Sequence, residues 1–157
     1  MRRFLVLFPL LWNLTACTTE SSQIEDVGID GARAELKGEL KKSLDDRMQG
    51  KEILKENYLN KILDRTEFSV EEVDRSEASA KVKVKIKTVP LKVREALTDI
   101  MVKVDPVQEN NFNVPDALAL ISKQYGLEPS ADLEMKKTIL LKKEGVWKAQ
   151  APAKPIP

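Results

Sequence analysis

Residues 78–87 read Ala-Ser-Ala-Lys-Val-Lys-Val-Lys-Ile-Lys, an alternation of small or apolar residues with polar ones. Successive side chains of a β-strand point to opposite faces, so this pattern predicts a strand with one apolar face and one lysine face. A strand with one buried and one solvated face is typical of an antiparallel sheet. The apolar face therefore marks the core around which the other segments must be arranged.

Further strands are predicted before and after this segment. Alternating apolar residues over 68–73 indicate a short strand that precedes it. Residues 133–143 and 146–149 indicate a final hairpin, with a tight turn at Glu144-Gly145. Together the four segments predict an antiparallel meander.

The remaining apolar residues follow helical spacing. Within residues 32–48 an apolar side chain recurs every four residues, and residues 53–65 carry a wider apolar face. Residues 90–126 form a helical excursion between the second and third strands, in which 107–114 is a polar loop and Gly126 closes the last helix. Helices segregated from a strand meander define the α+β class, with N-terminal helices packed on a curved antiparallel sheet.

Composition divides the chain into four parts. Residues 1–16 have the organisation of an export signal, and the polar residues 17–31, rich in Thr, Ser and Gly, are expected to form a flexible tether. Residues 32–150 suffice for a single α+β domain. Residues 151–157 contain three prolines and are expected to be an extended, unpacked tail.

The strand pattern and the final hairpin resemble a known family. Alternation over 78–86, followed by a hairpin that ends Lys143-Glu144-Gly145-Val146-Trp147-Lys148, is similar to small exported lipoproteins of the nuclear transport factor 2-like, or cystatin-like, superfamily. The resemblance covers residues 32–150. It implies a curved antiparallel sheet wrapped on helices, with a pocket between them.

The N-terminal segment has the order of an export signal. Arg2 and Arg3 precede an uncharged apolar stretch over residues 4–12, and small residues stand immediately before Cys17. Leu14-Thr15-Ala16-Cys17 resembles the lipobox of bacterial lipoproteins. The resemblance implies lipidation of the Cys17 thiol, cleavage before Cys17, and acylation of the new N-terminus. The membrane is then the first expected partner, reached through the lipidated Cys17.

The residues after Cys17 bear on the choice of membrane. In enteric bacteria an Asp directly after the lipidated cysteine retains a lipoprotein at the inner membrane, whereas this chain has Thr18 and Thr19. The resemblance therefore implies the outer membrane, on its periplasmic face.

Two other interpretations of the N-terminal segment were weighed. A transmembrane anchor is disfavoured, because the 11 residues 4–14 would span about half of a hydrocarbon core about 30 Å thick. A plain secretory signal would leave Cys17, the only cysteine, unpaired in an exported protein.

Composition restricts the possible chemistry. The chain has no histidine, which excludes imidazole bases and imidazole metal ligands, and its one thiol is assigned to the lipid. Without Arg2 and Arg3, 24 basic residues face 25 acidic ones, so no nucleic-acid partner is expected. Phosphate-binding, calcium-loop and nucleophile-elbow motifs are absent from the sequence. We therefore expect no catalytic residues, no metal site and no cofactor.

One candidate surface is the lysine face of the predicted strand. Four ammonium groups spaced along one side would suit anionic headgroups or an acidic partner protein. Alternatively, lysine is the usual solvent-facing residue of a strand and discourages edge pairing, and acids on the neighbouring strand would neutralise part of the row. The candidate patch consists of Lys81, Lys83, Lys85 and Lys87.

Aromatic residues give a second candidate site. Tyr125 and Trp147 would line a ligand pocket, although a lone tryptophan in a final hairpin is more often a core residue. Enzymes of the resembled superfamily pair a buried carboxylate with a tyrosine, but no acid stands in an apolar strand setting here. The asparagines of Glu109-Asn110-Asn111-Phe112-Asn113 are expected to cap the following helix rather than to bind a ligand.

Two classes of function follow from the sequence. The first is a noncatalytic lipoprotein domain that engages an envelope protein partner or the cell wall. The second is a carrier or sensor that binds a small or lipid-like ligand in the concave face of the sheet. An apolar pocket between helices and sheet would favour the second class, and a filled core would favour the first.

Overall fold

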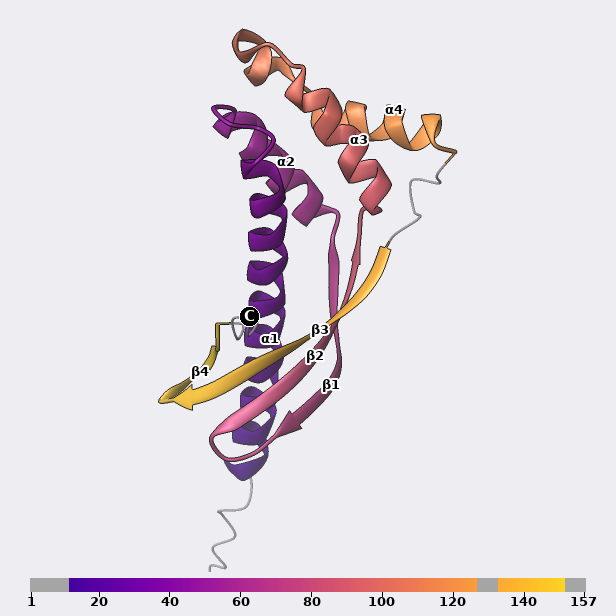
Figure 1. Ribbon diagram of the computed structural model, residues 1–157. Coiled ribbons are helices and arrows are strands. Elements are labelled where there is room, and N and C mark those ends of the chain that lie inside the picture. The colour runs from indigo at the N-terminus through magenta and orange to yellow at the C-terminus, as the bar shows by residue number, and fades with distance from the viewer. Residues whose placement is uncertain (1–11, 127–132, 152–157) are drawn as a thin grey trace, which may run out of the picture.

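The computed structural model describes residues 12–126 and 133–151, and its helices and sheet form an α+β domain (Figure 1). The helices are α1 Trp12–Asp45, α2 Glu52–Asp64, α3 Leu91–Val102, the 3-10 helix η1 Pro106–Asn111 and α4 Val114–Gln124. The strands are β1 Glu67–Arg75, β2 Ser79–Thr88, β3 Leu133–Glu144 and β4 Val146–Ala149. The predicted fold class is confirmed.

The four strands form one antiparallel sheet in the order β1-β2-β3-β4. The inner face of β2 is fully buried, and Val82, Val84 and Ile86 have no exposed surface. A bulge between Val70 and Glu72 adds one residue to β1, which returns Val73 to the inner side after Phe68 and Val70. The predicted faces of the central strand are therefore correct.

The sheet crosses the N-terminal half of α1, and the other helices gather around its C-terminal end (Figure 1). α1 contacts all four strands and α2, whereas α4 packs on α2 and α3. All buried apolar side chains of the described residues belong to one cluster that runs from the sheet into the helices.

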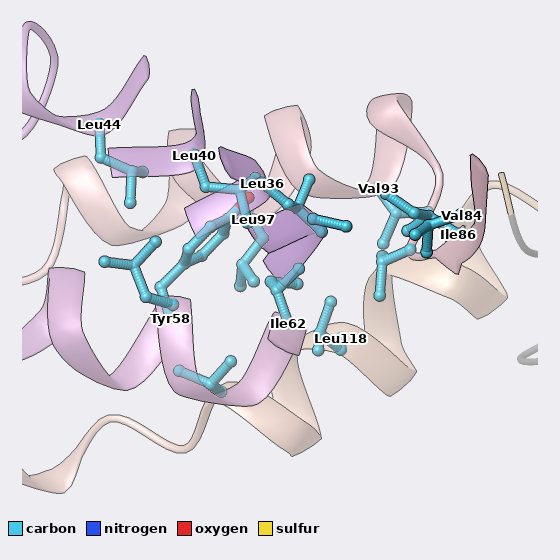
Figure 2. Packing of buried hydrophobic residues seen from close by; sticks show 14 of the residues in the cluster. Leu36, Leu40, Leu44, Tyr58, Ile62, Val84, Ile86, Val93, Leu97 and Leu118 are labelled. Atoms are coloured by element: carbon cyan, nitrogen blue, oxygen red, sulfur yellow. The ribbon is translucent and has the colours of Figure 1, made fainter. Parts of the chain in front are cut away.

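The apolar stripe of α1 explains how one helix packs against both the sheet and the other helices. Its buried positions recur every four residues, at Ile24, Gly28, Ala32, Leu36, Leu40 and Leu44. Four residues turn an α-helix by about 400°, so the stripe advances about 40° at each step and about 200° overall. The N-terminal part of the stripe meets the sheet. In Figure 2, Leu36, Leu40 and Leu44 lie beside Tyr58, Leu97 and Ile62 from α2 and α3.

The expected flexible tether over residues 17–31 is wrong, because these residues lie within α1. Ile24 is fully buried, and a Cβ on Gly28 would lie 2.5 Å from Val82 Cγ1. A Cβ on Gly31 would lie 2.7 Å from Ile139 Cγ2. The glycines therefore permit close approach of α1 to the sheet, and the α+β domain includes residues that the composition had assigned to a linker.

Turns and caps follow the sequence in most places. Asn113 Oδ1 accepts a hydrogen bond from the Asp116 amide at 3.3 Å, which confirms the predicted helix cap. Gly126 after α4 and Gly145 between β3 and β4 have φ values of 62° and 78°, as left-handed turn positions require. The polar loop expected at 107–114 instead contains η1. The predicted tail lies outside the described residues apart from Ala151. Of the predicted signal over residues 1–16, residues 1–11 lie outside the described part and residues 12–16 belong to α1.

Gly28→Ala is expected to destabilise the domain by about 1–3 kcal/mol, because the added methyl group must displace Val82 in a packed core. Urea unfolding of the soluble Cys17→Ala chain measures this. Gly38→Ala is the matched control, since a Cβ there meets nothing within 4 Å. The control should stabilise α1 by about 0.5–1 kcal/mol through helix propensity. Equal effects of the two changes would contradict the close packing of α1 on the sheet.

Candidate functional site

Cys17 lies near the start of α1, in the same continuous helix that carries the core stripe. Three residues later, Glu20 is the first residue of α1 that contacts the sheet through a described side chain. No helix in the described part of the chain combines the length and the apolar character needed to cross a membrane. The predicted lipidation residue is thus separated from the folded domain by less than one helical turn.

Glu20 is the centre of a polar cluster that joins α1 to the strands, which we call the Glu20 cluster: Glu20, Arg75, Lys143 and Trp147. Lys143 Nζ donates to Glu20 Oε1 at 2.6 Å, and Trp147 Nε1 donates to the same oxygen at 3.3 Å. Arg75 lies 3.6 Å from Glu20 Oε2. Lys143 Nζ also stands 5.6 Å from the centre of the Trp147 ring, within cation–π range.

The Glu20 cluster stabilises the charged form of its carboxylate. The hydrogen bond from Lys143, followed by that from Trp147, holds the pKa of Glu20 below its ordinary value. Trp147 itself is only 5% exposed, and its hydrogen bond to Glu20 satisfies the indole N–H at the edge of the core. The pattern of charges in the sequence did not reveal this cluster, because its members come from four separate elements, α1, β1, β3 and β4.

The lysine row lies on the outer face of the sheet, as predicted, and acids neutralise most of it. Lys85 and Lys87 lie 3.0 and 3.8 Å from Glu134 on β3, and Lys83 lies 3.7 Å from Glu72 on β1. Hydrogen bonding to Lys85 lowers the pKa of Glu134. In the pairing of β1 with β2, Asp74 lies opposite Lys81. The geometry therefore favours a solvated, internally paired face over an anion-binding one.

Tyr125 and Trp147 do not form the predicted common pocket. Trp147 is a buried residue of β4 beside Glu20, whereas Tyr125 follows α4 and is 52% exposed. Figure 1 places β4 and the end of α4 at opposite sides of the molecule. The helical excursion carries Tyr125 away from the sheet, so the pocket interpretation of this pair is wrong.

The concave face of the sheet is occupied by α1 and offers no room above β2, because Gly28 contacts Val82. A groove of about 640 Å³ lies instead at the side of α1, where the helix faces the middle of β3 and the end of β4. Its wall is mainly small and apolar, and Glu35, Glu39 and Lys42 stand among its lining residues. The small and apolar lining residues are Gly31, Ala34, Gly38, Ile139, Ala149 and Ala151.

Two charged residues at covered positions were not anticipated, the half-buried Lys137 and the buried Glu109. Lys137 occupies an inner position of β3 and pairs with Glu39 at 2.5 Å and Glu35 at 3.2 Å on α1. Burial opposes its charged form, but these two carboxylates raise the pKa of Lys137 overall. Met135, Lys137 and Ile139 stand at every second position of β3, and this spacing could have placed Lys137 on the inner face of the strand. Glu109 in η1 is 5% exposed, and its Oε1 has no hydrogen-bond partner among the described residues.

The described residues contain no group of three or more potential metal-ligating Cys, Asp or Glu side chains. Tyr58 lies in the core, where burial raises its pKa to about 12. Comparisons with protein-family models, with curated proteins and with solved structures found no match.

Glu20→Gln is expected to lower the free energy of unfolding at pH 7, and the deficit should shrink as the pH falls below 4.5. A carboxyl whose folded pKa is depressed contributes stability above its unfolded pKa and loses it as the pH falls through the folded pKa. Urea unfolding at pH 7, 5 and 3, followed by Trp147 fluorescence, measures both effects. Asp26→Asn changes an exposed acid of the same helix and is the control. A pH-independent deficit in Glu20→Gln would contradict the charge-based interpretation.

Proposed function

We propose that this protein is a lipid-anchored bacterial envelope protein whose domain is a noncatalytic interaction module. The observation that carries the proposal is Leu14-Thr15-Ala16-Cys17 at the end of a short export signal, with the only cysteine of the chain in the modified position. Cleavage before Cys17 and outer-membrane sorting, with the domain in the periplasm, are parts of the same proposal.

The proposed modification would supply anchoring that the folded domain lacks. Three acyl chains bury on the order of forty methylenes at about 0.8 kcal/mol each, whereas a single chain binds membranes only marginally. The mature chain has a formal charge of −1, and its lysine row is largely paired, so electrostatic attraction to a membrane contributes little. The lipid would therefore dominate membrane association.

The exposed apolar side chains support an interaction role for the helical layer formed by α2, α3, η1 and α4. Of the nine exposed large apolar residues in the described part of the chain, seven belong to it, and the other two, Leu140 and Val146, belong to the sheet. Contiguous exposed apolar patches mark interaction sites, so we take this layer as the part of the domain that contacts a partner. The seven exposed apolar residues of the helical layer are Ile53, Leu91, Ile100, Val102, Val107, Leu120 and Tyr125.

Membership of the nuclear transport factor 2-like superfamily is part of the proposal as well. It rests on the strand alternation and the Lys143–Lys148 hairpin sequence, and the α+β order of the chain is compatible with it. No enzymatic role is included, because the sequence presents no histidine to act as a general base and none of the catalytic motifs sought in it.

Cys17→Ala should abolish labelling by radioactive palmitate in a Gram-negative host and should move the protein out of the membrane fraction or leave it uncleaved. The domain should still fold, since the first buried apolar residue of α1 in the described side chains is Ile24. Circular dichroism of the soluble product checks the fold. Thr18→Ala, with the lipobox intact, is the control and should label normally. Equal labelling of the wild type and Cys17→Ala would refute the lipoprotein proposal.

A carrier role is the second candidate, favoured by the apolar groove beside α1 rather than by the concave face. A fatty acid titrated into the soluble Cys17→Ala chain should then give saturable heat in calorimetry. Ala34→Leu would fill the groove and should abolish that heat. Ala119→Leu enlarges an exposed alanine of α4 and should leave it unchanged. Absence of saturable heat in the parent chain would remove this candidate.

A further inference from the structure

We propose that the domain stands end-on at the membrane surface, with the Glu20 cluster against the phospholipid headgroups and the helical layer farthest from the bilayer. This inference rests on the proposed lipidation of Cys17 and deepens it by assigning the surface that meets the membrane. It replaces the expectation of a flexible tether between lipid and domain.

The first argument is the length of the connection. Cys17 and Glu20 are three residues apart in one helix, which corresponds to a rise of about 4.5 Å. A flexible chain of 15 residues, such as the tether expected over 17–31, would have an end-to-end distance of about 20 Å. The lipid attachment point is therefore much closer to the folded domain than a tether would place it.

The second argument is that this end of α1 is fastened to the sheet. Glu20 is held by Lys143 from β3, Trp147 from β4 and Arg75 from β1, so three strands restrain the same carboxylate. Ile24, one helical turn further on, is fully buried. A lipid on Cys17 would thus pull on a structured end rather than on a loose segment, and the domain would be oriented by its own packing.

The third argument is the chemistry of the surface at this end. A polar hollow of about 470 Å³ is lined by Glu20, Arg75, Ser76, Glu77 and Lys143. Mixed cationic, anionic and hydroxyl groups suit the zwitterionic and hydrated headgroup layer, but not the hydrocarbon core. The hollow therefore favours contact with headgroups without insertion.

The direction of α1 places the other end of the molecule away from the bilayer. From Cys17 to Asp45 the helix rises about 42 Å, and the helical layer gathers at that far end (Figure 1). The outer sheet face offers little attraction to an anionic surface, because Glu72 and Glu134 pair with its lysines. An end-on orientation leaves the exposed apolar residues of the helical layer available to a periplasmic partner.

Trp147 makes the inference directly testable, because Trp12 precedes Cys17 and Trp147 is the only other tryptophan. The purified lipidated chain is reconstituted in vesicles of phosphatidylethanolamine and phosphatidylglycerol that carry a nitroxide on the headgroup or deep in the acyl chain. Headgroup nitroxide should quench Trp147 fluorescence at least twofold more than deep nitroxide. Palmitate labelling of the same sample reports separately whether the lipid is present.

Two matched variants separate the alternatives. Twelve Gly and Ser residues inserted between Thr19 and Glu20 keep the lipid and the core but lengthen the connection, and headgroup quenching should be largely lost. The double change Trp147→Phe, Val107→Trp moves the fluorophore to an 86% exposed position in η1, where neither nitroxide should quench it. If that variant does not fold, Val107→Cys labelled with a fluorophore in the otherwise unchanged lipidated chain gives the same measurement.

Each outcome is decisive for a different statement. Labelled protein without headgroup quenching of Trp147 would overturn membrane contact while leaving the lipoprotein proposal intact. Unchanged quenching after the Gly-Ser insertion would overturn the short connection as its cause. Equal quenching at positions 147 and 107 would show a domain lying flat and would overturn the end-on orientation. Absence of palmitate would instead refute the proposed function on which the inference rests.

Discussion

The close contact between α1 and β2 at Gly28 is the constraint on which the rest of the structure depends. A residue with a Cβ at this position would overlap Val82, so the helix axis can lie this near the sheet only because glycine is present. Gly31 has the same role against Ile139 on β3. With the helix seated at this depth, the concave face is filled. This is why the fold has a packed core where the resembled superfamily implies a pocket.

The apolar stripe of α1 winds around the helix, and it therefore joins the sheet and the other helices in a single core. Because apolar positions recur every four rather than every 3.6 residues, the buried side of the helix rotates from the sheet toward α2 and α3 along its length. Leu36, Leu40 and Leu44 then complete the helical part of the core (Figure 2). The ion pairs around the core are mostly exposed and contribute little each, so stability comes chiefly from this continuous burial. Lys55 and Lys137 are exceptions among the described ion pairs, since each is largely covered and contacts two carboxylates.

The elements that could be predicted from sequence are those whose pattern is local. The strand at 79–88 alternates with period two, so its position and its faces could be predicted, and the final hairpin could be located because a glycine stands at its turn. The N-terminal part of α1 was missed because Thr, Ser and Gly favour a linker by composition. Its periodicity nevertheless continues from Leu36 back through Ala32 and Gly28 to Ile24, which a search for spacing rather than hydrophobicity would have found. The site was less predictable. The Glu20 cluster and the separation of Tyr125 from Trp147 depend on how distant segments meet, and no local pattern encodes this.

The proposed cleavage before Cys17 is compatible with this architecture for a physical reason. Removal of residues 13–16 would take away the carbonyl groups that accept hydrogen bonds from the amides of residues 17–20 in a continuous helix. The new first turn would carry two threonines and Glu20, and an acid there interacts favourably with the positive end of the helix dipole. Arg75 and Lys143 already hold that acid against the sheet, so the shortened helix would retain its fastening. Since Ile24 is the first buried apolar residue among the described side chains of α1, processing would leave the described packing of the core intact. The proposed export processing and folding would thus act on adjacent but separate parts of the same helix.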